Sequence, residues 1–193
     1  THGRLAELGE VIVDRVRRWM PRLPSDRLMF MNLHPEELAD PAGMAARLAP
    51  LAAYAHRIVL EITERSQVTG LEFWEESVAR VREMGFALAV DDLGAGYSSL
   101  AVLAELQPSF IKVDMSIVRG VDHDPRKQRL INLLCRFAEA TDAHLIAEGV
   151  ETQEEADALL LTGAHLLQGY FFGRPTQNAA EILADLESET ALA

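Results

Sequence analysis

The amino-acid sequence predicts an α/β fold in which repeated strand and helix units build a parallel sheet. Six short apolar or β-branched runs alternate with longer stretches of helical period. Most of these runs are almost continuously apolar, which is typical of strands covered on both faces. Each run also has a polar residue near its C-terminal end. That regularity favours a βα barrel, because all C-terminal strand ends of a barrel converge on one face.

The six expected strands are short and separated by helix-length segments. They span residues 28–33, 57–63, 86–92, 110–114, 144–149 and 166–172.

The helical segments have recognisable ends. Gly85 is expected to terminate the helix that contains Trp74, and Gly163 is expected to terminate a later one. Thr152 and Glu155 have the spacing of a capping box at the start of that later helix. A further apolar stripe, expected to face the core, consists of Leu130, Leu133, Leu134 and Phe137.

Length and composition predict a single domain over residues 1–193. About half of the chain is apolar (49%), which is enough for one sizeable core. No apolar run approaches the roughly 20 residues of a membrane span, and the first residues lack a signal-peptide layout. We therefore expect a cytoplasmic domain that makes no membrane contact. The lone Cys135 lies in an apolar helix and is expected to be a buried structural thiol.

The net charge of −12 argues against a surface that binds long nucleic acid. A small anionic ligand would need local positive charge, which divalent metal held by carboxylates could supply.

The polar residues at the strand ends are the main indication of function. They are Asn32, Glu61, Asp91 with Asp92, Lys112, Glu148 and Gln168. Any one of them could merely cap a turn or helix. Together, at equivalent positions, they predict one shared site. Carboxylate and amide oxygens suit Mg²⁺ or Mn²⁺, whereas a zinc site would be expected to use His or Cys.

The adjacent carboxylates of Asp91 and Asp92 repel each other and need cations or strong hydrogen bonds to offset that repulsion. A two-metal site provides such cations and is a common device for hydrolysing phosphodiesters. The GAGYSSL segment that follows the pair supplies glycines and backbone amides that could face a phosphate.

Six segments carry a resemblance to a known family. They are MNLHPEEL, LEITE, DDLGAGYSSL, FIKVD, AEGVET and QGYFFGRP. In this order and spacing they resemble the motifs of EAL domains, over nearly the whole chain. That resemblance implies a modified TIM (β/α)8-type barrel that hydrolyses cyclic di-GMP to linear pGpG with two Mg²⁺ or Mn²⁺ ions.

The resemblance also implies roles for individual residues. The metal ligands would be Asn32, Glu61, Asp91, Asp92 and Glu148, with Glu148 also a possible base. Lys112 would position or polarise the nucleophilic water, and Gln168 would support the site. Glu64 resembles the glutamate that holds the loop after the Asp pair. Glu151 resembles an acidic residue that lies behind the metal ligands and does not itself bind metal. The loop after the Asp pair contains Gly94, Gly96 and Ser98.

One departure from the family is large. The Glu-Ala-Leu strand, whose glutamate is a metal ligand, has no counterpart here, and the first residues resemble the helix that follows it. We therefore interpret the chain as an EAL-like barrel lacking its first strand region. Either the sequence begins inside a longer protein, which we favour because a barrel without a strand exposes unpaired backbone, or the natural protein lacks the strand.

Three functions follow from the resemblance. The first is a cyclic di-GMP phosphodiesterase, favoured because the other matched positions are retained. The alternatives are an impaired domain that binds cyclic di-GMP as a receptor, and a protein-interaction module. The family also implies a homodimer, formed through the loop after Asp92, and upstream sensor or GGDEF domains as partners.

Overall fold

The computed structural model describes residues 2–63, 72–94 and 100–176. Its centre is a six-stranded sheet in which every neighbouring pair is parallel and the strands follow one another in chain order. The strands are β1 (Met29–Asn32), β2 (Ile58–Thr63), β3 (Ala87–Leu93), β4 (Phe110–Val113), β5 (His144–Glu148) and β6 (Leu166–Gln168). Each therefore lies within one or two residues of an expected strand, except at the end of β6.

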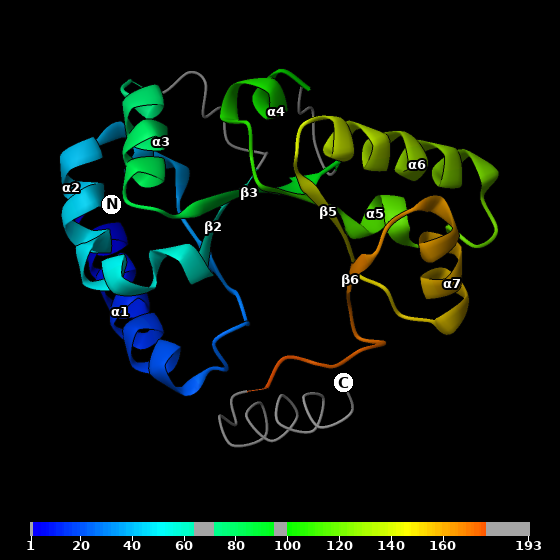
Figure 1. Cartoon of the computed structure of the whole chain (residues 1–193), viewed down its shortest axis with the longest axis horizontal. Helices are drawn as coiled ribbons and strands as arrows, with labels where there is room; N and C mark the ends of the chain where they lie inside the picture. The colour runs from blue at the N-terminus through cyan, green and yellow to red at the C-terminus, as the bar shows by residue number, and fades with distance from the viewer. Residues whose placement is uncertain (1, 64–71, 95–99, 177–193) are drawn as a thin grey trace.

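The helices lie along the outside of the arc that the strands form (Figure 1). The α-helices are α1 (His2–Trp19), α2 (Pro41–Leu48), α3 (Trp74–Glu83), α4 (Leu100–Leu106), α5 (Met115–Val118), α6 (Pro125–Ala140) and α7 (Gln153–Thr162). Three 3₁₀ helices complete the set: η1 (Met20–Arg22), η2 (Pro35–Ala39) and η3 (Ala49–Arg57). Each crossover brings the chain back to the same end of the sheet, so consecutive strands are parallel neighbours.

The described strands form an open half-barrel, because β1 and β6 are the two edges of the sheet. This is the α/β barrel-type architecture that the sequence predicts. Among the described residues, no helix is both long enough and apolar enough to cross a membrane.

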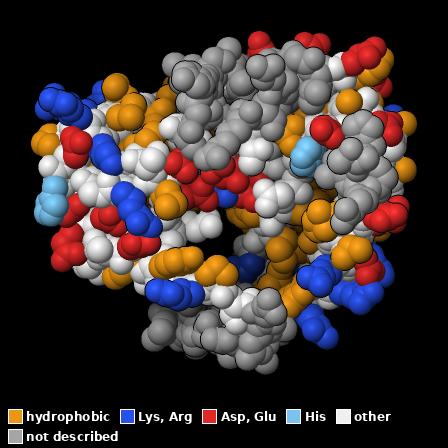
Figure 2. Space-filling model, turned by 180° about the vertical axis from the view of Figure 1, so that it is seen from behind, with side chains coloured by type: hydrophobic (Ala, Val, Ile, Leu, Met, Phe, Trp, Pro, Cys, Tyr) orange, Lys and Arg blue, Asp and Glu red, His pale blue; other side chains and the backbone are white. Residues whose placement is uncertain are grey.

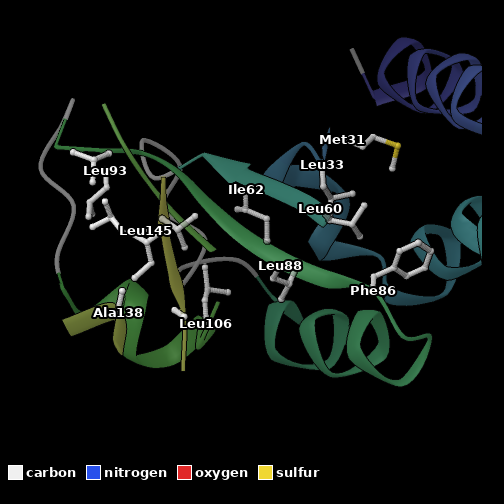
Figure 3. Packing of buried hydrophobic residues seen from close by; sticks show 14 of the residues in the cluster. Met31, Leu33, Leu60, Ile62, Phe86, Leu88, Leu93, Leu106, Ala138 and Leu145 are labelled. Atoms are coloured by element: carbon white, nitrogen blue, oxygen red, sulfur yellow. The ribbon is translucent and has the colours of Figure 1, made fainter. Parts of the chain in front are cut away.

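The core lies between the sheet and its helices. Leu60, Ile111 and Ile131 are fully enclosed, and Leu88 and Leu106 pack in the same cluster (Figure 3). β2 is buried along its length up to its last residue, which explains its almost uninterrupted apolar run. The apolar residues of the strands thus account for the core and leave the polar strand ends to the site.

The observed helix ends confirm most of the predicted caps. Gly85 and Gly163 have φ angles of +88° and +98°, the left-handed conformation that glycine adopts without strain. Thr152 caps α7 by accepting a hydrogen bond from the Glu155 amide at 3.2 Å. The reciprocal half of the capping box is absent at this helix, because the Glu155 carboxylate binds the amides of Gly120 and Glu151 instead.

Two expectations were wrong in part. The last strand ends at Gln168, and residues 169–172 form a turn in which the Phe171 amide donates to the Val150 carbonyl at 3.0 Å. On α6, Leu130 and Leu133 are exposed (43% and 63%), and the buried face instead carries Ile131, Cys135 and Ala138. A run rich in leucine fits several helical faces, and only packing against the sheet selects one.

Candidate active site

Parallel pairing places the polar residues side by side at the C-terminal edge of the sheet. Asn32 lies in register with Glu61, and Glu148 lies in register with Gln168. Asp91 is in register with Thr63 at the end of β2. Because all six strands run the same way, residues more than 100 positions apart in the sequence share this edge.

The Asp91–Asp92 pair sits at an irregularity in the sheet. The register between β3 and β4 shifts between Val90 and Leu93, as at a β-bulge. Asp92 has a φ of +61°, and its amide donates to Asp91 Oδ1 at 3.0 Å. In a regular strand successive side chains point to opposite faces, whereas here the two carboxylates reach the same site.

Lys112 lies at the centre of three carboxylates. Its Nζ is 2.5 Å from Glu61 Oε1, 2.7 Å from Glu148 Oε1 and 3.0 Å from Asp91 Oδ1. The lysine side chain is only 6% exposed, so these contacts are largely shielded from water. Each carboxylate comes from a different strand, and β4 supplies the cation that holds them together.

The electrostatic consequences are opposite for Lys112 and Glu148. Burial tends to lower the pKa of Lys112, but hydrogen bonds and charges from Glu148 and Glu61 outweigh it, and the net pKa lies above its ordinary value. Burial raises the pKa of Glu148; Lys112 lowers it, the Asp91 charge raises it again, and the net value is about 7. Lys112 is therefore a permanent cation, and Glu148 can exchange a proton near neutral pH.

The carboxylates of Asp91, Asp92 and Glu148 fit a divalent metal ion. One oxygen from each lies within 4.8 Å of the others, and all three side chains are half-buried. Hard oxygen donors of this kind are those that Mg²⁺ and Mn²⁺ prefer. Burial is the main cause of the raised pKa of Glu148 and the Asp91 charge adds to it, and a nearby cation would favour the ionised carboxylate.

A pocket of about 310 Å³ opens beside this cluster. Its lining consists of Asp92, Asp114, Met115, Arg119, Glu148, Gly149, Glu151, Gln168, Gly169 and Tyr170. Figure 2 shows acidic side chains gathered near the centre of one face of the molecule, next to a hollow. The carboxylate cluster is thus accessible to a ligand rather than sealed in the core.

The structure brings most of the expected residues to this edge of the sheet, although they do not all line the same pocket. Asn32 lines a different pocket, of about 260 Å³, together with Thr63 and residues of α1. Glu61 contacts Lys112 but is not one of the three carboxylates whose oxygens lie within 4.8 Å of one another. Glu64, Gly96 and Ser98 lie outside the described residues.

The structure describes two of the residues that were expected around the metal ligands, Glu151 and Gly94. Glu151 lines the pocket and forms an ion pair with Arg119. Gly94 has a φ of +102°, and a Cβ there would lie 2.2 Å from Ile117 Cδ1. A side chain at position 94 would therefore force the Ile117 side chain to move and would be strained by the positive φ.

The sequence reading did not single out Asp114, Arg119 and Tyr170, which also line the pocket. Asp114 comes directly after β4, and Tyr170 lies two residues beyond β6, so both follow strand ends. Position relative to the strand ends would have indicated these two. Arg119 lies beyond the short helix α5, and no local pattern places it at the site.

Comparison with known proteins agrees with this arrangement. The EAL domain profile matches residues 2–175. The chain belongs to the EAL domain family. Over 163 residues it is 35% identical to the cyclic di-GMP phosphodiesterase RocR of Pseudomonas aeruginosa, covering 82% of this chain and 41% of RocR. The chain therefore spans about two fifths of that relative's length.

Solved structures of the family show the same fold. A complex of Klebsiella pneumoniae BlrP1 with calcium and cyclic di-GMP superposes with a TM-score of 0.78 and 31% identity, covering 88% of this chain and 43% of BlrP1. Its manganese complex gives a TM-score of 0.80 and 30% identity, with 88% and 45% coverage. BlrP1 thus holds a divalent ion together with cyclic di-GMP in both complexes.

Proposed function

We propose that this domain hydrolyses one phosphodiester of cyclic di-GMP to give linear pGpG, with Mg²⁺ or Mn²⁺ as cofactor. The observation that supports this most strongly is the cluster of Asp91, Asp92 and Glu148 beside an open pocket. Lys112 contacts Asp91 and Glu148 of this cluster. Family membership and the names of the relatives support cyclic di-GMP as the substrate.

The reaction adds the oxygen of a water to phosphorus and breaks the bond from phosphorus to the 3′ oxygen. Bound metal supplies positive charge over the reacting phosphate and lowers the pKa of water. Asp91, Asp92 and Glu148 would hold it. Glu148 would act either as a ligand of the ion or as the base that accepts the proton of the attacking water, and the leaving 3′ oxygen takes up a proton.

Lys112 contributes a fixed charge and a fixed geometry. Its ammonium group holds Glu61, Asp91 and Glu148 within 3.0 Å, so the carboxylates remain close despite their mutual repulsion. Three N–H donors directed at three acceptors leave the group little rotational freedom. Gln168, beside Glu148 in the sheet, has an amide that can orient water or substrate in the same pocket.

The test is to incubate the 193-residue polypeptide and the full-length protein with cyclic di-GMP and Mn²⁺ and to follow pGpG by chromatography. Lys112→Ala should reduce turnover about 10²- to 10⁴-fold, the usual contribution of a positioned proton-transfer network. Arg126→Ala is the control, since Arg126 is an exposed cation in the first turn of α6 and does not line the pocket.

The two alternatives give different results in the same experiment. Cyclic di-GMP binding without turnover by either form would identify a receptor domain. Neither binding nor turnover would favour a protein-interaction module. Turnover that persists in Lys112→Ala would contradict the role given to this lysine.

We further propose that the domain acts in the cytoplasm as a homodimer and is regulated by a sensor or GGDEF domain outside these residues. One relative, MucR of Pseudomonas aeruginosa, is named as a bifunctional diguanylate cyclase and cyclic di-GMP phosphodiesterase, and this chain covers 28% of it. The expected dimer contact includes residues 95–99, which lie outside the described part of the chain. A monodisperse monomer at high concentration with dinucleotide and metal would contradict the dimer.

A further inference from the structure

A cyclic dinucleotide carries two phosphates, and only one of them is hydrolysed in a single cleavage. The carboxylate cluster is suited to hold metal over the reacting phosphate. The second phosphate lies on the opposite side of the ring and carries its own negative charge. A pocket that accepts the whole molecule needs a further positive group at a distance from the metal.

The charged side chains of the pocket lining repel that second phosphate, with one exception. Its charged members are the acidic residues Asp92, Asp114, Glu148 and Glu151, together with Arg119. Lys112 does not line the pocket, and its ammonium is already surrounded by three carboxylates. Arg119 is therefore the basic side chain of the lining.

We propose that Arg119 binds the phosphate of the cyclic dinucleotide that is not under attack, and that Glu151 holds the guanidinium ready for it. This inference rests on the proposed function and adds a residue to the substrate-binding surface. The contact would set how tightly and in which orientation the dinucleotide lies across the carboxylate cluster.

The side chain of Arg119 is available for such a contact. Its Nη2 donates to Glu151 Oε1, and that pair is solvent-accessible, with 44% of the arginine side chain and 38% of the glutamate side chain exposed. An exposed ion pair contributes little to stability, so sharing the arginine with a ligand costs little. Guanidinium has five N–H donors in a planar fork, and a phosphate can accept two of them at once.

The backbone around Arg119 is held in place by two groups. The buried Glu155 carboxylate accepts hydrogen bonds from the amides of Gly120 and Glu151, both at 2.9 Å. It thus joins the same two segments that the Arg119–Glu151 pair joins. Lys127 Nζ donates to the Arg119 carbonyl at 2.5 Å. Arg119 therefore projects from a fixed position, which lowers the entropy lost when a ligand is bound.

The experiment compares two substrates in the full-length protein. Cyclic di-GMP has two phosphates, whereas bis(p-nitrophenyl) phosphate has only the one that reacts. Arg119→Ala should raise KM for cyclic di-GMP about tenfold or more, the usual effect of removing a hydrogen bond to a charged group. KM for the single phosphate should rise at least several-fold less, and Arg119→Lys should restore part of the cyclic di-GMP affinity.

The matched control is Arg126→Ala, which removes the same charge from an exposed position in the first turn of α6. Equal effects of Arg119→Ala on both substrates, or a KM no different from that of Arg126→Ala, would overturn the inference. Glu151→Gln leaves Arg119 in place but removes the charge that holds it. It should give a smaller rise in KM for cyclic di-GMP than Arg119→Ala.

A binding measurement separates failure of this inference from failure of the proposed function. Equilibrium dialysis of cyclic di-GMP in EDTA requires neither metal nor turnover. If the wild-type protein binds cyclic di-GMP in EDTA but forms no pGpG when Mn²⁺ is supplied, the hydrolase assignment fails. The inference then stands only if Arg119→Ala weakens that binding about tenfold relative to Arg126→Ala. Absence of wild-type binding in both assays would overturn both proposals.

Discussion

Replacing Lys112 by methionine should make the stability of the domain strongly pH-dependent. Lys112 is buried and lies 2.5–3.0 Å from three carboxylates, so its removal leaves those charges facing one another. Breaking a buried ion pair by removing one partner costs about 3–5 kcal/mol. Methionine is of similar length and apolar, which keeps the loss of packing small compared with the loss of charge.

The pH dependence follows from the pKa of Glu148. In the wild type this pKa is raised to about 7, so the carboxyl stabilises the fold most at low pH and that contribution is lost as pH rises through about 7. Lys112 acts to lower the pKa of Glu148, so the variant raises it further. Above pH 7 the folded variant keeps one proton that the folded wild type has released, while Glu148 is ionised in both unfolded states.

The retained proton determines how steeply the free energy of unfolding changes with pH. For each pH unit, the free energy of unfolding of the variant falls by about 1.4 kcal/mol relative to that of the wild type. Between pH 7 and 8.5 the destabilisation should therefore grow by about 2 kcal/mol. Urea unfolding of the 193-residue polypeptide in EDTA at pH 6, 7 and 8.5 measures the difference in free energy of unfolding between the wild type and Lys112→Met. Lys127→Met is the control and should show no such slope. A Lys112→Met destabilisation that is the same at all three pH values would refute the reasoning.

Two further predictions concern groups near the pocket. Burial raises the pKa of Glu155, but hydrogen bonds from the backbone amides of Glu151 and Gly120 outweigh it, and the net pKa is lowered. The ionised carboxylate therefore stabilises the fold above the unfolded pKa of about 4.3. This stabilisation is lost as pH falls through the lower pKa of the folded state. Glu155→Gln should cost about 1–2 kcal/mol at pH 7 and lose less stability than the wild type on acidification, as followed by urea unfolding; parallel pH curves would contradict this. A Cβ at Gly169 would lie 2.1 Å from the Val150 carbonyl oxygen, whereas a Cβ at Gly173 meets nothing within 4 Å. Gly169→Ala should therefore lower the thermal midpoint by several degrees and Gly173→Ala should leave it nearly unchanged; equal midpoints would show that the turn after β6 accommodates the methyl group.

The sequence by itself determined where the six strands lie along the chain and that their polar ends share one edge of the sheet. Buried parallel strands require continuous apolar runs, and these are visible without any tertiary information. A polar residue at the end of such a run lies at the C-terminal edge of the sheet whatever the details of packing. For this reason Asp91, Lys112 and Glu148 could be placed together from the sequence, as their ion pairs confirm.

Tertiary structure decided what depends on side chains meeting across segments. The left-handed φ of Asp92 and the register shift beside it bring two adjacent carboxylates to one site, which strand periodicity alone would not predict. The capping-box pattern at Thr152 did not reveal that the Glu155 carboxylate would bind the Gly120 amide 35 residues away. The Arg119–Glu151 pair joins the segments after β4 and β5, and its spacing of 32 residues follows no local rule. Local sequence fixes backbone periodicity, whereas contacts between loops depend on how neighbouring strands bring those loops together.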